Sequence, residues 1–239
     1  SFFHSFRKSD QDKWLYHTVA TLSHVVEFGN HWRLQTSVKS HLQEAAAYLV
    51  FRQTGDGSLR PGIRTTEAAI DLRWAPNEQY FQRNMVRKPI GNKYPVFNLR
   101  YNAGIRGLLG GEYEYHALRF DIHKRWYLSQ LGFSDIRAGT GYIFGRVPFP
   151  LLDIPMANQS FLLAADSYSL MNDLEFVSDQ FVKFSVEHRF QGFFFNKIPL
   201  LKKMKIRELI GAKLFYGGLR NENNPLKNPE LFYFPVDRE

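Results

Sequence analysis

Apolar and polar residues alternate one by one along several long stretches of the chain. In the clearest stretch the even positions are apolar apart from one histidine, namely Val182, Phe184, Val186, His188 and Phe190. The odd positions there are polar or charged, namely Lys183, Ser185, Glu187 and Arg189. A period of two residues is typical of a β-strand with one apolar and one polar face.

The same alternation recurs along most of the chain. It predicts strands near residues 17–29, 31–40, 44–53, 64–75, 95–105, 113–127, 133–146, 159–171, 177–190 and 204–217. Turn-forming residues separate these segments, for example Gly55-Asp56-Gly57 and Gly110-Gly111. The stretch 40–50, SHLQEAAAYLV, has helical propensity, but we predict a strand there as well. We therefore expect an all-β chain with ten or eleven strands.

Two all-β architectures compete for this pattern. Strands of soluble β-sandwiches average about 5–6 residues, whereas a tilted strand that crosses a membrane needs about 9–11 residues. The predicted strands are nearer the longer value, and their polar faces carry opposite charges in rows, as in Arg119, Asp121, His123 and Arg125. Such rows are typical of a hydrated barrel interior. The pattern favours an antiparallel transmembrane β-barrel, with a soluble sandwich as the alternative.

A barrel also predicts which side chains meet lipid. In two strands the expected lipid-facing residues are Leu118, Phe120, Ile122, Trp126, Val182, Phe184, Val186 and Phe190. The expected lumen-facing residues are Arg119, Asp121, His123, Arg125, Lys183, Glu187 and Arg189. His188 falls on the lipid side, so we expect it near a membrane–water interface.

The composition is compatible with a barrel. Among 239 residues there is no Cys, which excludes disulfides and thiolate metal sites. Aromatic residues make up 16% of the chain, and aromatic girdles are typical of outer-membrane barrels. No run approaches the roughly 18–20 apolar residues of a membrane-spanning helix. The net charge of +8 would suit nucleic acid, but the basic residues are scattered, so no nucleic-acid partner is expected.

The segment GFFFNKIPLLKK, residues 192–203, interrupts the alternation between the last two predicted strands. Its aromatic residues are followed by Lys202, Lys203 and Lys205. Aromatic side chains and lysines gather where a membrane meets water. We interpret the segment as a turn at that boundary, and a hydrophobic hairpin inside a soluble core is the alternative.

Four segments carry a family resemblance: NKYPVFNLRYNAG (92–104), KRWYLSQLGFSDI (124–136), FGRVPFPLL (144–152) and residues 174–225. Together they resemble Bacteroidetes outer-membrane proteins described as carboxypeptidase-like regulatory-domain-containing proteins. The resemblance covers most of residues 64–239, and residues 1–63 match only in general character. Such proteins carry a small periplasmic β-sandwich ahead of a barrel, and we expect this sequence to hold the barrel part alone.

That barrel is in turn similar to the surface-antigen superfamily of outer-membrane insertases and translocators, which implies sixteen strands. By this similarity 177–190 is the twelfth strand, with Glu187 at its acidic position, and 204–217 is the thirteenth. A barrel does not leave an edge open in lipid. We therefore expect residues 1–239 to be one partial barrel that lacks N-terminal strands, the periplasmic domain and the last strands.

The insertases of this superfamily use an Arg-Gly-aromatic loop whose Arg is held by acidic groups on the twelfth and thirteenth strands. Here the preceding loop, residues 169–180, has no Arg-Gly, and Tyr216 stands at the second acidic position. The tripeptide Ile105-Arg106-Gly107 lies several strands too early and is expected to be a hairpin turn. The resemblance thus implies a departure from the insertase mechanism.

The sequence offers little other chemistry. Asp121 and His123 stand in one row, but no nucleophile or metalloprotease motif accompanies them, so an ion-pair network is expected. The eight His show no metal-ligand spacing. The stretch NENNP, 221–225, is expected to be an exposed loop rather than a cation site. We expect no enzyme activity, no catalytic residue, no cofactor and no metal.

These observations lead to a functional expectation. The chain is expected to be an integral, surface-antigen-like protein of a Gram-negative outer membrane that takes part in protein insertion or envelope assembly. The alternative is a structural or accessory barrel subunit of a larger envelope complex, without transport activity. Expected partners are outer-membrane lipids, lipopolysaccharide, and other outer-membrane or periplasmic proteins.

Overall fold

One antiparallel sheet dominates the structure, a computed structural model that describes residues 13–47, 49–83, 86–90, 92–158, 167–171 and 174–235. Its eight strands are β1 (Lys13–Glu27), β2 (Trp32–Ala47), β5 (Gly62–Trp74), β8 (Val96–Gly104), β9 (Tyr115–Tyr127), β10 (Phe133–Phe144), β11 (Gln180–Arg189) and β12 (Leu209–Gly218). They pair in the order of the sequence, so the sheet is a meander with β1 and β12 at its edges. The all-β prediction is confirmed.

Smaller elements occupy the connections. Two short hairpins are formed by β3 (Phe51–Arg52) with β4 (Leu59–Arg60) and by β6 (Tyr80–Arg83) with β7 (Val86–Pro89). Single 3-10 turns are η2 (Leu108–Gly110), η3 (Ser129–Leu131), η4 (Phe149–Leu151), η5 (Phe195–Lys197) and η6 (Asn221–Asn223), and α1 (Pro199–Met204) is a six-residue helix. No helix within the described ranges is long and apolar enough to cross a membrane.

Four predicted strands need correction in three places, and the sheet holds eight strands instead of ten or eleven. Segments 31–40 and 44–53 merge, because β2 continues to pair with β5 through Glu44 and runs on to Ala47. The strand predicted for SHLQEAAAYLV is thereby confirmed over 40–47. The segment 204–217 starts late, because α1 and Lys205, with φ of 53°, precede β12.

The third correction concerns the strand predicted at 159–171. Residues 159–166 lie outside the described residues. In 167–171 there is no strand, and a single bridge joins Tyr168 to Ala157. The prediction failed there because the segment lies against the sheet's polar face instead of pairing with a strand, as the cavity described below shows.

The register places apolar residues opposite apolar residues and charged residues opposite charged residues. On one face Phe97 stands opposite Ile122 and Leu99 opposite Phe120, while on the other face Arg125 stands opposite Asp135. A shift of one residue would exchange the two faces. The predicted sidedness of 118–126 and 182–190 is therefore confirmed as two opposite rows.

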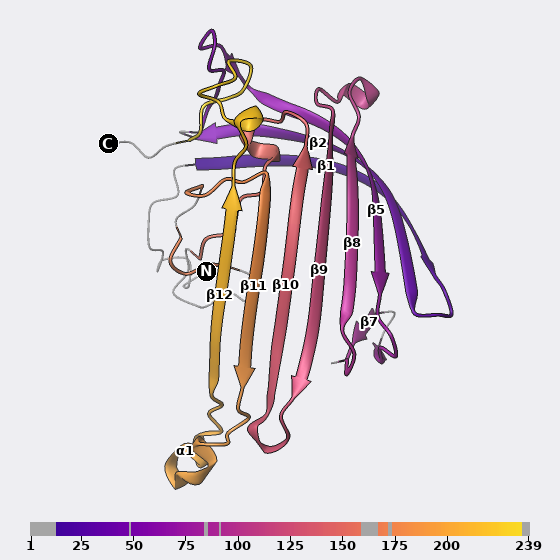
Figure 1. The fold of residues 1–239 in the computed structure, drawn as a ribbon, viewed down its shortest axis with the longest axis vertical. Helices are drawn as coiled ribbons and strands as arrows, with labels where there is room; N and C mark the ends of the chain where they lie inside the picture. Colours follow the sequence, from indigo (N-terminus) through magenta and orange to yellow (C-terminus); the bar gives the residue numbers. More distant parts are fainter. Residues whose placement is uncertain are drawn as a thin grey trace.

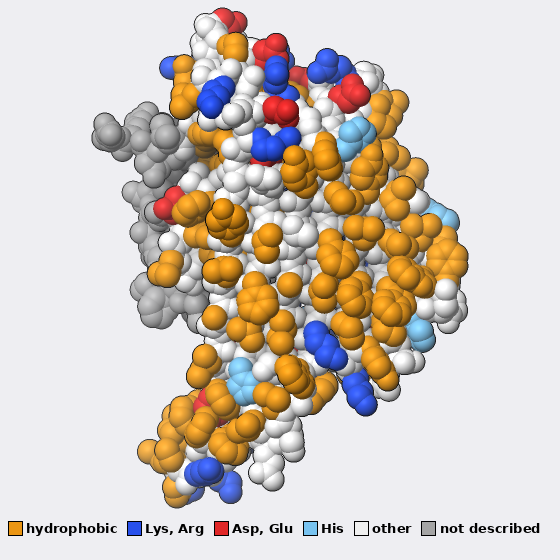
Figure 2. Space-filling view, in the orientation of Figure 1, with side chains coloured by type: hydrophobic (Ala, Val, Ile, Leu, Met, Phe, Trp, Pro, Cys, Tyr) orange, Lys and Arg blue, Asp and Glu red, His pale blue; other side chains and the backbone are white. Residues whose placement is uncertain are grey.

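The sheet curves around its polar face. Strands β8–β12 run nearly side by side along the long axis, whereas β1 and β2 turn away from that direction (Figure 1). Arg33 of β2 and Lys183 of β11 line the same cavity although four strands separate them in the sheet. The charged face is thus concave. The convex face seen in Figure 2 is largely hydrophobic, with charged side chains gathered at its upper and lower ends.

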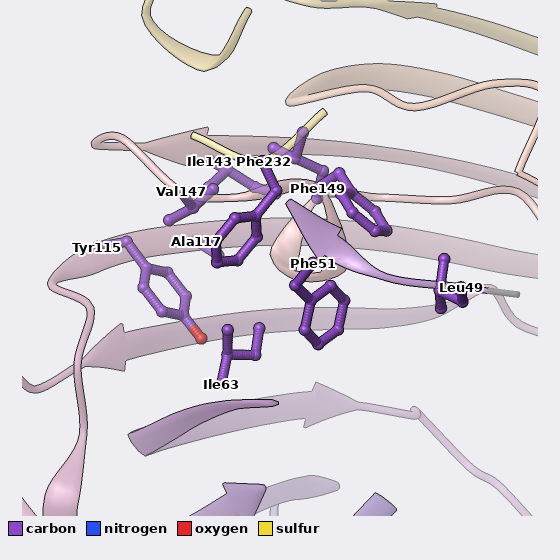
Figure 3. Close-up of a cluster of buried hydrophobic side chains, with 10 residues drawn as sticks. Leu49, Phe51, Ile63, Tyr115, Ala117, Ile143, Val147, Phe149 and Phe232 are labelled. Carbon is purple, nitrogen blue, oxygen red and sulfur yellow. The ribbon is translucent and has the colours of Figure 1, made fainter. Parts of the chain in front are cut away.

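A hydrophobic cluster closes the upper end of the concave face. Phe51, Phe149 and Phe232 come from three distant parts of the chain and are each at most 2% exposed. Their rings pack with centroids 5.8 Å apart for Phe51 and Phe149 and 5.4 Å apart for Phe51 and Phe232. Ile63 of β5 and Tyr115 of β9 belong to the same cluster (Figure 3). The cluster thereby holds the connecting segments against one end of the sheet.

Candidate functional site on the concave face

Charged side chains occupy alternate positions of neighbouring strands on the concave face. They include Arg33 and Lys39 of β2, Glu67, Asp71 and Arg73 of β5, Arg100 of β8, Arg119, Asp121, His123 and Arg125 of β9, Asp135 and Arg137 of β10, and Lys183, Glu187 and Arg189 of β11. Successive strand residues point to opposite faces, so the alternation in the sequence collects these groups on one side.

A two-point ion pair joins β9 to β10. The Nε and Nη2 groups of Arg125 donate to the two carboxylate oxygens of Asp135, each at 2.7 Å. The guanidinium also lies 4.2 Å from the centre of the Phe133 ring. Two-point pairs of this kind fix orientation as well as charge, so Arg125 and Asp135 hold the register of β9 and β10.

A second pair reaches across a whole strand. The Nζ group of Lys183 on β11 lies 2.9 Å from Oδ1 of Asp121 on β9, and Gly139 of β10 stands between the two positions in the register. A Cβ atom on Gly139 would lie 2.4 Å from Asp121 Oδ1 and 2.5 Å from Lys183 Cε. Gly139 therefore provides the space in which the pair forms.

The connection after β10 supplies another carboxylate to the concave face. Asp153 lies 3.0 Å from Arg119 and is fixed by two backbone hydrogen bonds with Ser178. Burial raises the pKa of Asp153, and the positive charges of Arg119 and Lys183 oppose that rise. Nothing in the alternation indicated this residue, because Asp153 lies in the non-periodic stretch FPLLDIP.

Two adjoining cavities open on the charged concave face. The larger, about 460 Å³, lies between the sheet and the segment around Asp153 and Tyr168, and has apolar walls at Met156 and Phe215. The smaller, about 320 Å³, is lined by five cationic side chains, Arg33, Arg73, Arg100, Arg119 and Lys183. Asn98, Asp121 and Lys183 line both. The arrangement suits binding of a polar or anionic group.

The Asp121–His123 row does not form a hydrogen-bonded pair. Asp121 pairs with Lys183, and Nε2 of His123 lies 3.7 Å from Oδ1 of Asp135, longer than a hydrogen bond. The predicted ion-pair network is what the described residues form here. Within the described ranges no three His, Asp or Glu side chains lie close enough to hold a metal ion.

The other residues weighed in the sequence have clear places. Arg106 donates from Nε to the carbonyl of Glu112 in the turn between β8 and β9, as expected for a hairpin turn. Glu187 lies on the concave face and accepts a 2.7 Å bond from Arg189. Tyr216 points to the convex side and is 77% exposed. Glu187 and Tyr216 thus lie on opposite faces.

The prediction that NENNP is an exposed loop is wrong for Asn223 and Pro225, which are both buried. Asn223 is 1% exposed, donates to Asp179 at 2.8 Å and accepts from the amide of Val147 at 2.8 Å. Asp179 is fully buried and also receives the Nε group of Arg220 at 2.9 Å. Sequence reasoning missed this hydrogen-bonded group because Asp179, Arg220 and Asn223 lie in connections outside the strands, where the period of two does not apply.

Glu208 organises the tip between β11 and β12. Its carboxylate accepts hydrogen bonds from the amides of Gly192, Phe194 and Phe195, at 2.8, 3.0 and 2.5 Å. Burial tends to raise the pKa of Glu208, but these amide bonds outweigh burial and lower it. The carboxylate that interrupts the apolar alternation therefore holds a folded turn. Leu200 and Met204 remain 68% and 61% exposed on α1.

The fold and the site define an all-β protein. Its antiparallel meander sheet has an apolar convex face and a cation-rich concave face. The chain belongs to the family described as "Family of unknown function (DUF5686) C-terminal domain", whose model matches residues 17–223. A search of curated proteins finds no match.

Proposed function

We propose that this chain is part of an outer-membrane β-barrel that serves outer-membrane protein or envelope assembly. The observation that carries the proposal is the division of the sheet into two unlike faces. The convex face exposes apolar side chains, including Leu118, Val182 and Leu214 at 40%, 51% and 60%. The concave face carries ion pairs. This distribution is what a bilayer outside and water inside require.

The strand lengths support the same proposal. The eight strands of the sheet have 9 to 16 residues, and a membrane strand needs about 9–11. A soluble sandwich would cover its apolar face with a second sheet. The described residues instead place their connecting segments over the charged face, as the buried cluster and Asp153 show. Closure of a barrel would require strands that pair with the edges β1 and β12.

The tip between β11 and β12 supports a membrane boundary at that end of the sheet. It displays Phe194, Leu200 and Met204 beside Lys202, Lys203 and Lys205. His188, at the lower end of β11, receives or donates a 2.8 Å bond with Ser134 and packs edge-on against Phe190. Partners of such a tip are lipid headgroups, among them those of lipopolysaccharide.

The location can be tested by extraction. Membranes from cells that express the whole protein are washed with alkaline carbonate and, separately, with urea. An integral protein stays in the pellet after both washes and is released by detergent. Release by either wash, with a known integral barrel retained in the same samples, would overturn the proposal.

The assembly role rests on the resemblance and on the charged concave face. Depletion of the protein is expected to lower the abundance of other outer-membrane proteins before growth stops. The alternative, an accessory barrel of a larger envelope complex, is favoured by the absence of an Arg-Gly-aromatic sequence from residues 169–180. Unchanged abundance of outer-membrane proteins after depletion would replace the assembly role with the accessory role.

A further inference from the structure

Two pairs of arginines face each other directly across neighbouring strands of the concave face. Arg33 of β2 stands opposite Arg73 of β5, and Arg100 of β8 stands opposite Arg119 of β9. Like charges in directly opposite positions destabilise an antiparallel pair. The sheet carries this unfavourable arrangement twice within four adjacent strands, at the wall of one cavity.

Carboxylates balance four of the five cations that line the smaller cavity. The pairs are Arg73 with Glu78 at 2.6 Å, Arg100 with Asp71 at 2.7 Å, Arg119 with Asp153 at 3.0 Å and Lys183 with Asp121 at 2.9 Å. Arg33 forms no direct ion pair with a described carboxylate, although Glu27 of β1 stands opposite it in the register and Glu78 is close enough to feel its charge. The Nε group of Arg33 is buried without a hydrogen-bond partner among the described residues. A buried donor without a partner is costly, so this guanidinium is the position that a ligand would satisfy.

We propose that the smaller cavity binds an oxyanion of the phosphate type, with Arg33 as its main donor. A guanidinium offers two parallel N–H groups that match two oxygens of a phosphate. Arg119 and Lys183 each pair with a carboxylate through one N···O contact and keep further N–H groups for the same anion. A bound anion would lie between the facing arginines and reduce the electrostatic repulsion between them.

The cavity dimensions indicate what else the ligand carries. At about 320 Å³ the smaller cavity is near the lower end of small-molecule sites, about 300–1,000 Å³. It shares Asn98 and Lys183 with the larger cavity, where Met156 and Phe215 provide apolar walls. A phosphate in the smaller cavity leaves room in the larger one for an organic body attached to it. The phosphate belongs either to a lipid headgroup or to a free phosphate compound.

The test measures binding to the whole chain, purified in a zwitterionic detergent without phosphate, by titration calorimetry. The probes are inorganic pyrophosphate and a short-chain phosphatidic acid below its micelle concentration. Both arms are run on the wild type, Arg33→Gln, Arg33→Lys and the control Arg60→Gln. Arg60 is an exposed cation paired with Glu112 outside the cavity.

The wild type is expected to bind at least one probe, and Arg33→Gln to weaken that binding about tenfold or more, the loss of one charged hydrogen-bonding group. Arg33→Lys should retain part of the affinity, and Arg60→Gln all of it. Binding of pyrophosphate indicates a free phosphate compound, whereas binding of the lipid alone indicates a headgroup. Failure of the wild type to bind either probe, or equal affinities of Arg33→Gln and Arg60→Gln, overturns the proposal.

A second measurement guards against a variant that is merely misfolded. Without a probe, Arg33→Gln is expected to melt at the same temperature as the wild type or higher, because it loses no ion pair and removes the repulsion from Arg73. Addition of pyrophosphate should raise the melting temperature of the wild type but not that of Arg33→Gln. Equal upward shifts for both proteins would contradict a site at Arg33. The binding test does not depend on membrane location, so it stands apart from the proposed function.

Discussion

Lys183 and Asp121 form a 2.9 Å ion pair across an entire intervening strand, over the Cα atom of Gly139. The pair links β11 to β9 without a backbone hydrogen bond between them. It exists because the residue between has no side chain.

We predict that Gly139→Val lowers stability by about 1–3 kcal/mol, the usual cost of overpacking. Valine favours strands, so a loss would come from displacement of the ion pair and from crowding. The measurement is urea-induced unfolding in detergent micelles. Gly211→Val is the control, because a Cβ there would have its nearest contact at 3.5 Å, with the carbonyl of Val186. Equal effects of the two substitutions would contradict the role of Gly139.

The two faces of β11 predict opposite responses to mutation. Phe184→Arg places a charge on the convex apolar face, where a bilayer, under the proposed membrane location, would make it cost about 2–4 kcal/mol. Lys183→Ala removes one partner of a half-exposed ion pair, which is worth about 0–1 kcal/mol. Unfolding in lipid bicelles measures both. A larger loss for Lys183→Ala would refute the assignment of the faces.

Asp179 is predicted to be among the most sensitive positions. It is fully buried and accepts hydrogen bonds from Arg220 and Asn223. Asp179→Ala leaves those donors without their partner and should cost about 3–5 kcal/mol. Glu222→Ala is a matched control, because Glu222 lies 2.9 Å from the same arginine but its side chain is 60% exposed. Its effect should stay below about 1 kcal/mol.

The tip held by Glu208 should loosen in acid. The pKa of Glu208 is lowered in the folded state, so its stabilising contribution is present above the usual value of 4.5 and is lost as the pH falls through the lowered value. Amide exchange at Gly192, Phe194 and Phe195 reports this directly. Glu208→Gln should exchange faster than the wild type at neutral pH and equally fast in acid. Identical exchange at neutral pH would contradict the model of a carboxylate-held turn.

The strands and their faces followed from sequence because a period of two is a strong, local signal. It located seven of the eight long strands as separate segments, and it assigned Arg119, Asp121, His123 and Arg125 to one face. The prediction divided β2 into two segments, since Ser40 and Glu44 interrupt the apolar positions that the alternation requires. Pairing with β5 carries the strand through those residues regardless.

Only some of the residues around the cavities could be predicted from the sequence. Arg119 and Lys183 were assigned to the interior by alternation. Arg33 joins them because the curvature of the sheet brings β2 toward β11. Asp153 joins them because the non-periodic connection after β10 folds back over the sheet. Curvature and long-range connections leave no short-range pattern, so no reading of successive residues would have joined these groups.

The hydrophobic cluster at the upper end has a consequence for the order of folding. Every long strand pairs with its neighbours along the chain, so the sheet is able to grow by one antiparallel pair after another. The cluster is different, because Leu49 and Phe51 meet Phe232 from the far end of the described chain. Docking of Phe232 therefore waits until all eight strands have been synthesised. Until that contact forms, Phe51 lacks the Phe232 ring that packs against it, so the burial of this end of the sheet is completed last.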